Sequence, residues 1–190
     1  MIWRNTHHRY GTVQLTLHWL TALMVAILIP LGLWMTGLDY YDPWYRKAPD
    51  LHRSIGVLLT GLLVLRLYWR ISQLQPDPAG GAAWQRTAAI ATHRLLYLVP
   101  FLSAISGYLI STADGRSVDV FGWFEIPATL TGIERQEDIA GDIHFALAML
   151  LLGLVVTHVT AALHHHFVMR DGLLWRMFPF RNQEAQKGEN

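Results

Sequence analysis

The sequence predicts an all-α membrane protein in which four transmembrane helices form one bundle. Hydrophobic residues make up 52% of the 190-residue chain, and they gather in four blocks at residues 15–38, 54–65, 95–113 and 143–169. The last block lies in a stretch without Asp, Glu, Lys or Arg between Asp142 and Arg170, which is longer than the roughly 20 apolar residues needed to cross a bilayer. We therefore expect one membrane domain over residues 1–190, surrounded by membrane lipid.

Positive charges predict the orientation of this domain. The expected spans cover about residues 12–35, 51–71, 88–111 and 141–169, with outer loops at 36–50 and 112–140 and a C-terminal tail at 170–190. Counted together with the adjoining helix ends, the N-terminal arm, the middle connection and the tail hold ten Lys and Arg residues, whereas the other two connections, counted in the same way, hold five. The positive-inside rule then puts both termini in the cytoplasm.

The chain has no cysteine, which excludes disulfides, iron–sulfur clusters and thiolate ligands. The N-terminal arm is polar and no cleavage site follows an apolar run, so no cleaved signal peptide is expected. A nucleic-acid partner is not expected either.

The first span carries His18 near its cytoplasmic end and Gly32 fourteen residues later. Fourteen residues are two heptads, so residues at this spacing share one seam of a helix in a supercoiled bundle. A glycine on that seam would let a flat macrocycle approach the helix, although ordinary close packing of membrane helices explains it equally well. The outer loop that follows is rich in Tyr and Trp, which is typical of the membrane interface.

The second span begins at LHRSIG, where Asp50 is expected to cap the helix and His52 lies at its outer end. Arg66 follows His52 by fourteen residues and so points along the same seam on the cytoplasmic side. Its guanidinium could pair with an anionic cofactor group or quinone, or extend to the cytoplasmic head groups. In the third span, His93 lies at the cytoplasmic start, where a surface or interfacial role is favoured.

The fourth span is unusual because an apolar run contains five histidines: His144, His158, His164, His165 and His166. Ionisable residues at membrane depth are costly and indicate function. His144 and His158 lie on one seam about 21 Å apart, so a single metal cannot use both, whereas two haems could each take one. His165 lies a further heptad along this seam, where it could hold a haem propionate or protonate a quinone. Interhelical hydrogen bonding is the alternative for an isolated histidine.

Depth in the bilayer sorts the histidines into two pairs. His52 and His144 both lie at outer helix ends, whereas His18 and His158 both lie toward the cytoplasm. Each pair suits a bis-imidazole, low-spin haem b, because covalent haem attachment would need cysteines. Iron with two protein ligands has no open position, which favours electron transfer over oxygen binding.

The second outer loop is the longest connection and contains the aromatic residues Phe121, Trp123 and Phe124, which argue against disorder. It could fold over the outer haem and control access to it. Anchoring of the loop at the membrane interface is an equally good interpretation.

With these residues in hand, the sequence resembles the bacterial cytochrome b561 family of four-helix, dihaem membrane proteins. The resemblance covers nearly the whole chain and rests on LHWL at His18, LHRSIG at His52, the His144/His158 pair and the C-terminal HHHFVMRDGLLWRM. The resemblance is strongest to one subgroup of the family, and the segments of this chain that carry it are GLWMTGLDYYDPWYRKAPDLHRSIG and SGYLISTADGRSVDVFGWF. Members of that subgroup are often encoded beside a periplasmic lipocalin-like protein of the polyisoprenoid-binding family.

The resemblance implies a bacterial inner-membrane location, four haem ligands at His18, His52, His144 and His158, and a quinone site near His165 with ubiquinone as substrate. The expected function is electron transfer between the periplasmic side and a membrane quinone near the cytoplasmic side. The alternative is a superoxide:ubiquinone oxidoreductase, a superoxide oxidase, as in one branch of the family. That enzyme would need a cationic funnel at the outer haem. The candidate residues for it are Arg46, Lys47, Arg53 and Arg116. A non-redox assembly module for the periplasmic partner is a third class.

Overall fold

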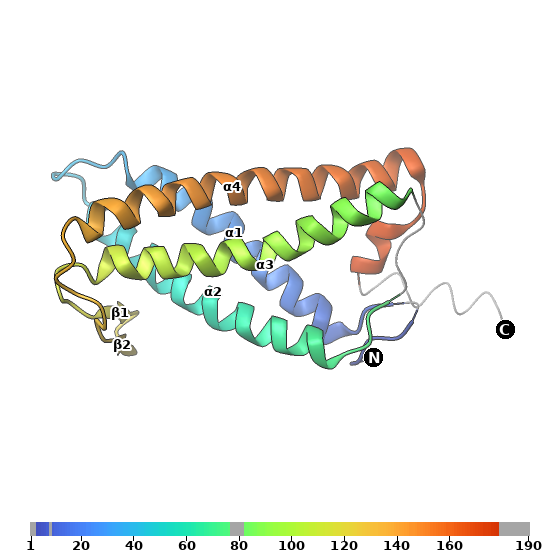
Figure 1. The fold of residues 1–190 in the computed structure, drawn as a ribbon, viewed down its shortest axis with the longest axis horizontal. Helices are drawn as coiled ribbons and strands as arrows, with labels where there is room; N and C mark the ends of the chain where they lie inside the picture. The colour runs from blue at the N-terminus through green and yellow to red at the C-terminus, as the bar shows by residue number, and fades with distance from the viewer. Residues whose placement is uncertain (1–2, 8, 77–81, 179–190) are drawn as a thin grey trace.

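Four long helices run antiparallel to their neighbours in one elongated bundle (Figure 1). The computed structural model describes residues 3–7, 9–76 and 82–178. The helices are α1 (Thr12–Met35), α2 (Lys47–Ser72), α3 (Ala83–Ser111) and α4 (Gln136–His164). All four are long and apolar enough to cross a membrane, which confirms the expected transmembrane four-helix bundle.

Shorter elements occur at both ends of the bundle. The connection between α3 and α4 contains an antiparallel hairpin of β1 (Val118–Val120) and β2 (Phe124–Ile126). Beyond α4, the chain continues through the π-helical turn η1 (His165–Met169) and the 3-10 helix η2 (Leu173–Met177). The part of the expected tail after residue 178 lies outside the described residues.

Helix α2 begins at Lys47, so the expected cap at Asp50 is wrong. Pro49 is compatible with this earlier start, because the first helical residues have no intrahelical acceptor for an N–H group. Asp50 lies in the first turn, where a carboxylate interacts favourably with the helix dipole. Its side chain pairs with Arg53 one turn later.

The bundle consists of two helical hairpins that meet across a small apolar core. The two helices of each hairpin, α1 with α2 and α3 with α4, share more contacts than helices of different hairpins do. Val25 of α1, Leu59 of α2 and Leu151 of α4 belong to the buried cluster between the hairpins. Each of the three follows a predicted histidine ligand of its own helix by seven residues, which is one heptad. The cluster therefore lies at the level between the outer and the inner histidine pair.

The β-hairpin lies beside the outer turns of α2 (Figure 1). Val118 and Val120 of β1 are buried, and β1 contacts α2. Ser54 of α2 accepts a hydrogen bond from the Phe121 amide (3.2 Å) and donates one to the Asp119 carbonyl (3.4 Å). The connection is therefore ordered, and its attachment point on α2 is only two residues from His52.

The N-terminal arm and the segment after α4 pack at the opposite end of the bundle. Asn5 donates a hydrogen bond to the Leu74 carbonyl (2.9 Å) and accepts one from the Gly11 amide (2.8 Å). Trp19 of α1 donates to the Met177 carbonyl at the end of η2 (2.8 Å). This end is therefore closed by segments from both extremes of the described chain.

Candidate functional site

An outer pair of imidazoles joins the two helical hairpins. His52 of α2 and His144 of α4 have ring centroids 6.1 Å apart with ring planes at 77°. An imidazole nitrogen binds a metal at about 2.0 Å and the ring centroid lies about 1.1 Å behind it, so two rings on opposite sides of one ion have centroids about 6.2 Å apart. The separation therefore fits one iron between the two rings.

The hydrogen bonds of His144 suit it to metal binding. Its Nδ1 lies 2.9 Å from the Ser103 carbonyl of α3 and 3.0 Å from Ser106 Oγ. Because a carbonyl only accepts, Nδ1 carries the ring proton and donates, which leaves the Nε2 lone pair available. This is the usual arrangement behind a metal-bound histidine. The partner ring of His52 has a buried Nδ1 without a partner among the described residues.

Two glycines pack against the outer imidazoles. A Cβ atom at Gly32 of α1 would lie 3.0 Å from His52 Cε1, and one at Gly107 of α3 would lie 3.2 Å from His144 Cε1. Any larger residue would push on the rings. Gly32 was predicted on the seam of His18, and it contacts the outer pair. Sequence reasoning missed Gly107, although it follows His93 by the same fourteen residues as Gly32 follows His18.

An inner pair of imidazoles lies toward the other end of the bundle. His18 of α1 and His158 of α4 have ring centroids 6.4 Å apart with planes at 70°. This separation also fits one metal ion between two rings. As in the outer pair, one ring comes from each helical hairpin.

Arg66 of α2 points inward to this pair. Its Nη2 lies 2.8 Å from Nδ1 of His18. A guanidinium only donates, so His18 Nδ1 accepts here and the ring proton is on Nε2. Iron at Nε2 would move that proton to Nδ1, and Arg66 would then turn to another acceptor, such as a haem carboxylate. The inner pair therefore fits an iron with a change of tautomer at His18.

Polar atoms without partners surround Arg66. The guanidinium lies over the Tyr97 ring of α3, with Cζ 5.0 Å from the centroid, and Arg70 lies over the same ring at 5.6 Å. Arg66 Nε, Trp69 Nε1 and the Tyr97 hydroxyl are buried and have no hydrogen-bond partner among the described residues. Three unmatched donors beside two cations suit an anionic group. Of the two roles predicted for Arg66, this geometry favours the inward one over head-group contact.

His93 of α3 also belongs to the inner group. Its ring centroid lies 5.3 Å from that of His158, with planes at 70°. The sequence favoured an interfacial role for this residue, because nothing within α3 alone indicates that its cytoplasmic end faces α4.

His165 lies where α4 changes from α- to π-helical geometry. Its Nδ1 pairs with Asp171 Oδ2 at 2.5 Å, and its ring lies 6.4 Å from that of His164. Among the described contacts of His165 there is none with His18 or His158. Partial burial raises the pKa of Asp171, but the hydrogen bonds from His165 and the Leu173 amide outweigh it and leave that pKa below its usual value.

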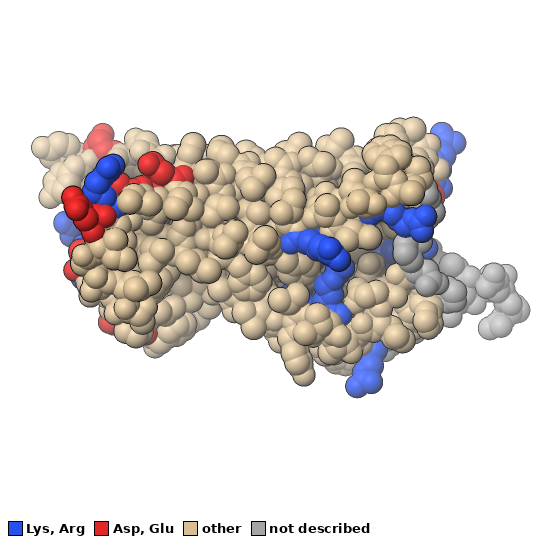
Figure 2. Space-filling view, viewed as in Figure 1, with Lys and Arg blue, Asp and Glu red and all other residues tan. Residues whose placement is uncertain are grey.

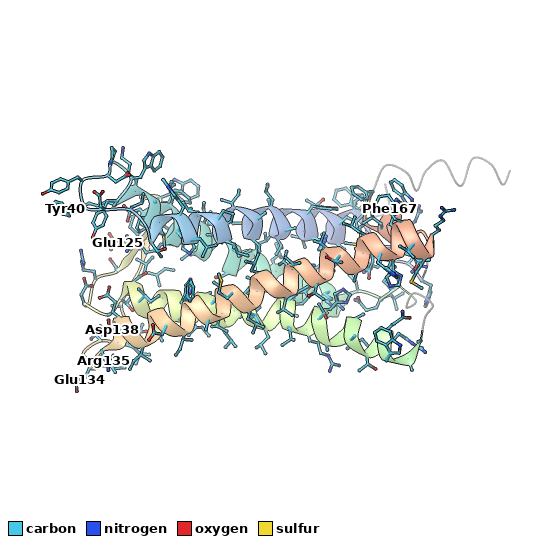
Figure 3. The ribbon with its side chains drawn as sticks, turned by 90° about the horizontal axis from the view of Figure 1, so that it is seen from above. Tyr40, Glu125, Glu134, Arg135, Asp138 and Phe167 are labelled. Carbon is cyan, nitrogen blue, oxygen red and sulfur yellow. The ribbon has the colours of Figure 1, made fainter. Side chains whose placement is uncertain are left out.

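Charges differ between the two ends of the bundle. On the face in Figure 2, acidic and basic residues mix at the end that carries the β-hairpin, whereas mainly Lys and Arg occur at the other end. Figure 3 shows Glu125, Glu134, Arg135 and Asp138 at the same end as Tyr40, and Phe167 at the opposite end.

Three of the four cations predicted for an outer funnel have other partners. Arg53 pairs with Asp50, and Arg116 pairs with Asp114. Lys47 lies over the Trp44 ring, 5.9 Å from its centroid.

Neither histidine pair is a conventional metal cluster. Within residues 3–7, 9–76 and 82–178, no group of three or more His, Cys, Asp or Glu side chains is placed to hold a metal ion. Two imidazoles per site suit a metal whose other ligands come from a macrocycle, because haem supplies four nitrogens in its plane.

Comparison with known proteins supports this interpretation. The family model described as prokaryotic cytochrome b561 matches residues 9–180. The chain is 49% identical to cytochrome b561 homolog 2 of Escherichia coli, over 93% of this chain and 95% of the relative. It is 28% identical to cytochrome b561 homolog 1 of the same organism, over 92% and 99%. It is 27% identical to a probable superoxide oxidase CybB of Yersinia pestis, over 91% and 97%.

The family match covers most of the chain, and its description as a cytochrome b implies haem b as the cofactor. Four membrane-spanning helices and the bacterial relatives agree with the expected inner-membrane location. The chain belongs to the prokaryotic cytochrome b561 family, and it is a multi-pass protein of the bacterial inner membrane that functions in transmembrane electron transfer.

Proposed function

We propose that this chain transfers electrons through two bis-histidine haems b, between the periplasmic side and a membrane quinone near the cytoplasmic side. The observation that carries the proposal is the pair of ring separations, 6.1 Å for His52 with His144 and 6.4 Å for His18 with His158. Both agree with the separation of about 6.2 Å for two imidazoles on one metal. The cytoplasmic position of both termini, which we infer from the positive charges, makes the His18 end the inner one.

Bound haem would supply one-electron redox chemistry at two depths of the bilayer. The chain's own part is to fix the ligands and the surroundings of each site. Ser103 of α3 keeps the proton of His144 on Nδ1 and its Nε2 free. The buried side chains of Val25, Leu59 and Leu151 form an apolar layer between the sites and exclude water from it.

The proposed quinone site lies near the cytoplasmic end. Arg66 is a candidate to hold a haem propionate or an anionic quinone, because its Nε is a buried donor without a partner among the described residues. His165 is a candidate to pass a proton to ubiquinone, because it shares a hydrogen bond with the carboxylate of Asp171. The direction of electron flow depends on the partner available at the outer end.

A periplasmic lipocalin-like protein is the proposed partner at that end, and the alternative function is superoxide oxidation. The exposed aromatic residues of the first outer loop, with Tyr41 91% exposed, would suit protein docking. The 27% identical relative that is named a probable superoxide oxidase favours the alternative. The carboxylate partners of Arg53 and Arg116 weaken it, because paired cations attract a small anion poorly.

The test of the haem assignment is the stoichiometry of four single variants. His144→Ala and His52→Ala should each lose the outer haem, and His18→Ala and His158→Ala the inner one, so each retains about half of the wild-type haem. His164→Ala is the matched control, because it removes an exposed histidine of the same helix. Two haems with unchanged spectra in any of the four variants would contradict the pairing.

The two functions are separated by the electron donor. Oxidised protein would receive superoxide pulses or ubiquinol while haem reduction is followed optically. Fast reduction by superoxide that decays when ubiquinone is present would support the oxidase. Reduction by quinol but not by superoxide would support the carrier. Absence of any b-type spectrum after haem supply would contradict both.

A further inference from the structure

We propose that His93 of α3 is a positioning residue for the inner site, and that it fixes the plane of the His158 ring without binding the iron. The inference rests on the proposed function, because it takes His18 and His158 as the inner haem ligands. It adds a residue that neither the sequence pattern nor the two pairs required.

A shared spacing relates His93 to the site residues of every helix. Each helix carries two such residues fourteen positions apart, which is about 21 Å along the axis. The four couples are His18 and Gly32 in α1, His52 and Arg66 in α2, His93 and Gly107 in α3, and His144 and His158 in α4. His93 therefore occupies the position in α3 that His18 occupies in α1, and it lies at the level of the inner histidine pair.

Helix α3 contacts both predicted ligands of α4. At the outer layer, Gly107 packs on His144, with a Cβ position 3.2 Å from Cε1. At the inner layer, His93 packs on His158, with ring centroids 5.3 Å apart. The two contacts occupy corresponding positions because the helices are antiparallel and both couples have the same spacing.

The separation of the rings argues against His93 as the ligand opposite His158. A distance of 5.3 Å is shorter than the about 6.2 Å required when a metal ion lies between two imidazoles, whereas His18 lies at 6.4 Å. His93 and His158 also belong to the same helical hairpin. The outer pair and the His18–His158 pair both join different hairpins.

His158 depends on this ring contact for its orientation. His144 has hydrogen bonds from Nδ1 to the Ser103 carbonyl and to Ser106. In the described part of the chain, no hydrogen bond to the His158 ring is found. Its plane is instead limited by edge-to-face contacts, with His93 at 70° and 5.3 Å. Removing the ring at position 93 would free His158 to rotate about its own side-chain bonds.

Ring orientation has a direct spectroscopic signature. The plane of an axial imidazole sets the splitting of the iron d orbitals, and that splitting determines the g values of a low-spin ferric haem. The test is therefore low-temperature EPR of the purified dihaem protein, with His93→Leu compared with His93→Phe. Both substitutions fill the site with an apolar group, but only Phe keeps a flat ring. His164→Ala serves as the control for loss of a histidine.

The expected result is that both His93 variants keep two haems per protein. In His93→Leu, one of the two low-spin signals should shift or broaden, and the remaining signal, which His144→Ala removes, should not change. His93→Phe should restore the wild-type g values. Unchanged signals in both variants would overturn the positioning role. Loss of one haem in both variants would make His93 a ligand and overturn the inference as well. Failure of the proposed function is distinguishable, because wild-type protein would then lack two low-spin signals.

Discussion

Replacing Arg66 by Gln should lower the midpoint potential of the inner haem and leave the outer one unchanged. Arg66 Nη2 lies 2.8 Å from His18 Nδ1, and an imidazole ring and a metal–nitrogen bond each add about 2 Å, which puts the charge about 7 Å from the iron position. We use this separation as the scale of the effect, because a guanidinium that turns from His18 to a haem carboxylate stays beside the inner site. At an effective dielectric constant of 20, Coulomb's law gives about 2 kcal/mol for this separation. That energy corresponds to about 100 mV for one electron. A positive charge favours the reduced haem, so its removal lowers the potential.

The assay is a spectroelectrochemical redox titration of the two haems in detergent or nanodiscs. His144→Ala identifies the inner component, because it should retain only that haem. The matched control is Arg70→Gln, which removes a charge one turn farther along α2 and should give a smaller shift. Arg70 lies over Tyr97 at 5.6 Å, and among the described residues it makes no hydrogen bond to a histidine, unlike Arg66. Equal shifts in both variants, or no shift in Arg66→Gln, would refute the close approach of Arg66 to the inner site.

Two further predictions concern the outer site and the C-terminal segment. Gly107→Leu should push on the His144 ring and reduce the haem content toward one per protein. Gly153→Leu is the control and should keep two haems per protein, because a Cβ atom at Gly153 would meet no neighbouring atom within 4 Å. Equal haem contents in the two variants would contradict the predicted contact. The hydrogen bond between Asp171 and His165 holds the segment after α4, and the pKa of Asp171 is lowered in the folded protein. Its contribution is therefore present at neutral pH and is lost as the pH falls below about 4, which amide exchange of residues 171–178 would detect. Asp171→Asn should abolish that acid transition and speed tryptic cleavage after the preceding arginine at neutral pH, and a wild-type acid profile in this variant would refute the role of the carboxylate.

The membrane bundle could be predicted because its signal is local and strong. Three of the four apolar blocks exceed or approach the length of a bilayer span, whereas the block at residues 54–65 is shorter, and the structure has a helix at each of the four. Helix boundaries were less predictable. Pro49 and Asp50 indicate a helix start at that position, but a proline is tolerated inside the first turn, and α2 begins at Lys47. The π-helical turn at His165 also has no simple sequence signal.

Only some of the residues in the outer and inner histidine sites could be predicted from the sequence. Equal spacing along single helices brought out the four candidate ligands, because that geometry depends on one helix at a time. The contact of Gly107 with His144, and that of His93 with His158, depend on the register between α3 and α4. A single sequence does not determine that register. The inward direction of Arg66 likewise depends on the neighbouring helix, because a long side chain near a helix end reaches either way.

Helix α4 contributes one imidazole to each proposed pair, and it is the last span to be synthesised. His18 and His52 therefore remain without partners on the nascent chain until the fourth helix has entered the membrane. Neither bis-histidine site would exist in a shortened chain that ends before residue 136. Haem would then bind only after α4 has been synthesised, because each bound haem would link the α1/α2 hairpin to the α3/α4 hairpin. Cofactor insertion and the final association of the two hairpins would thus be a single assembly event.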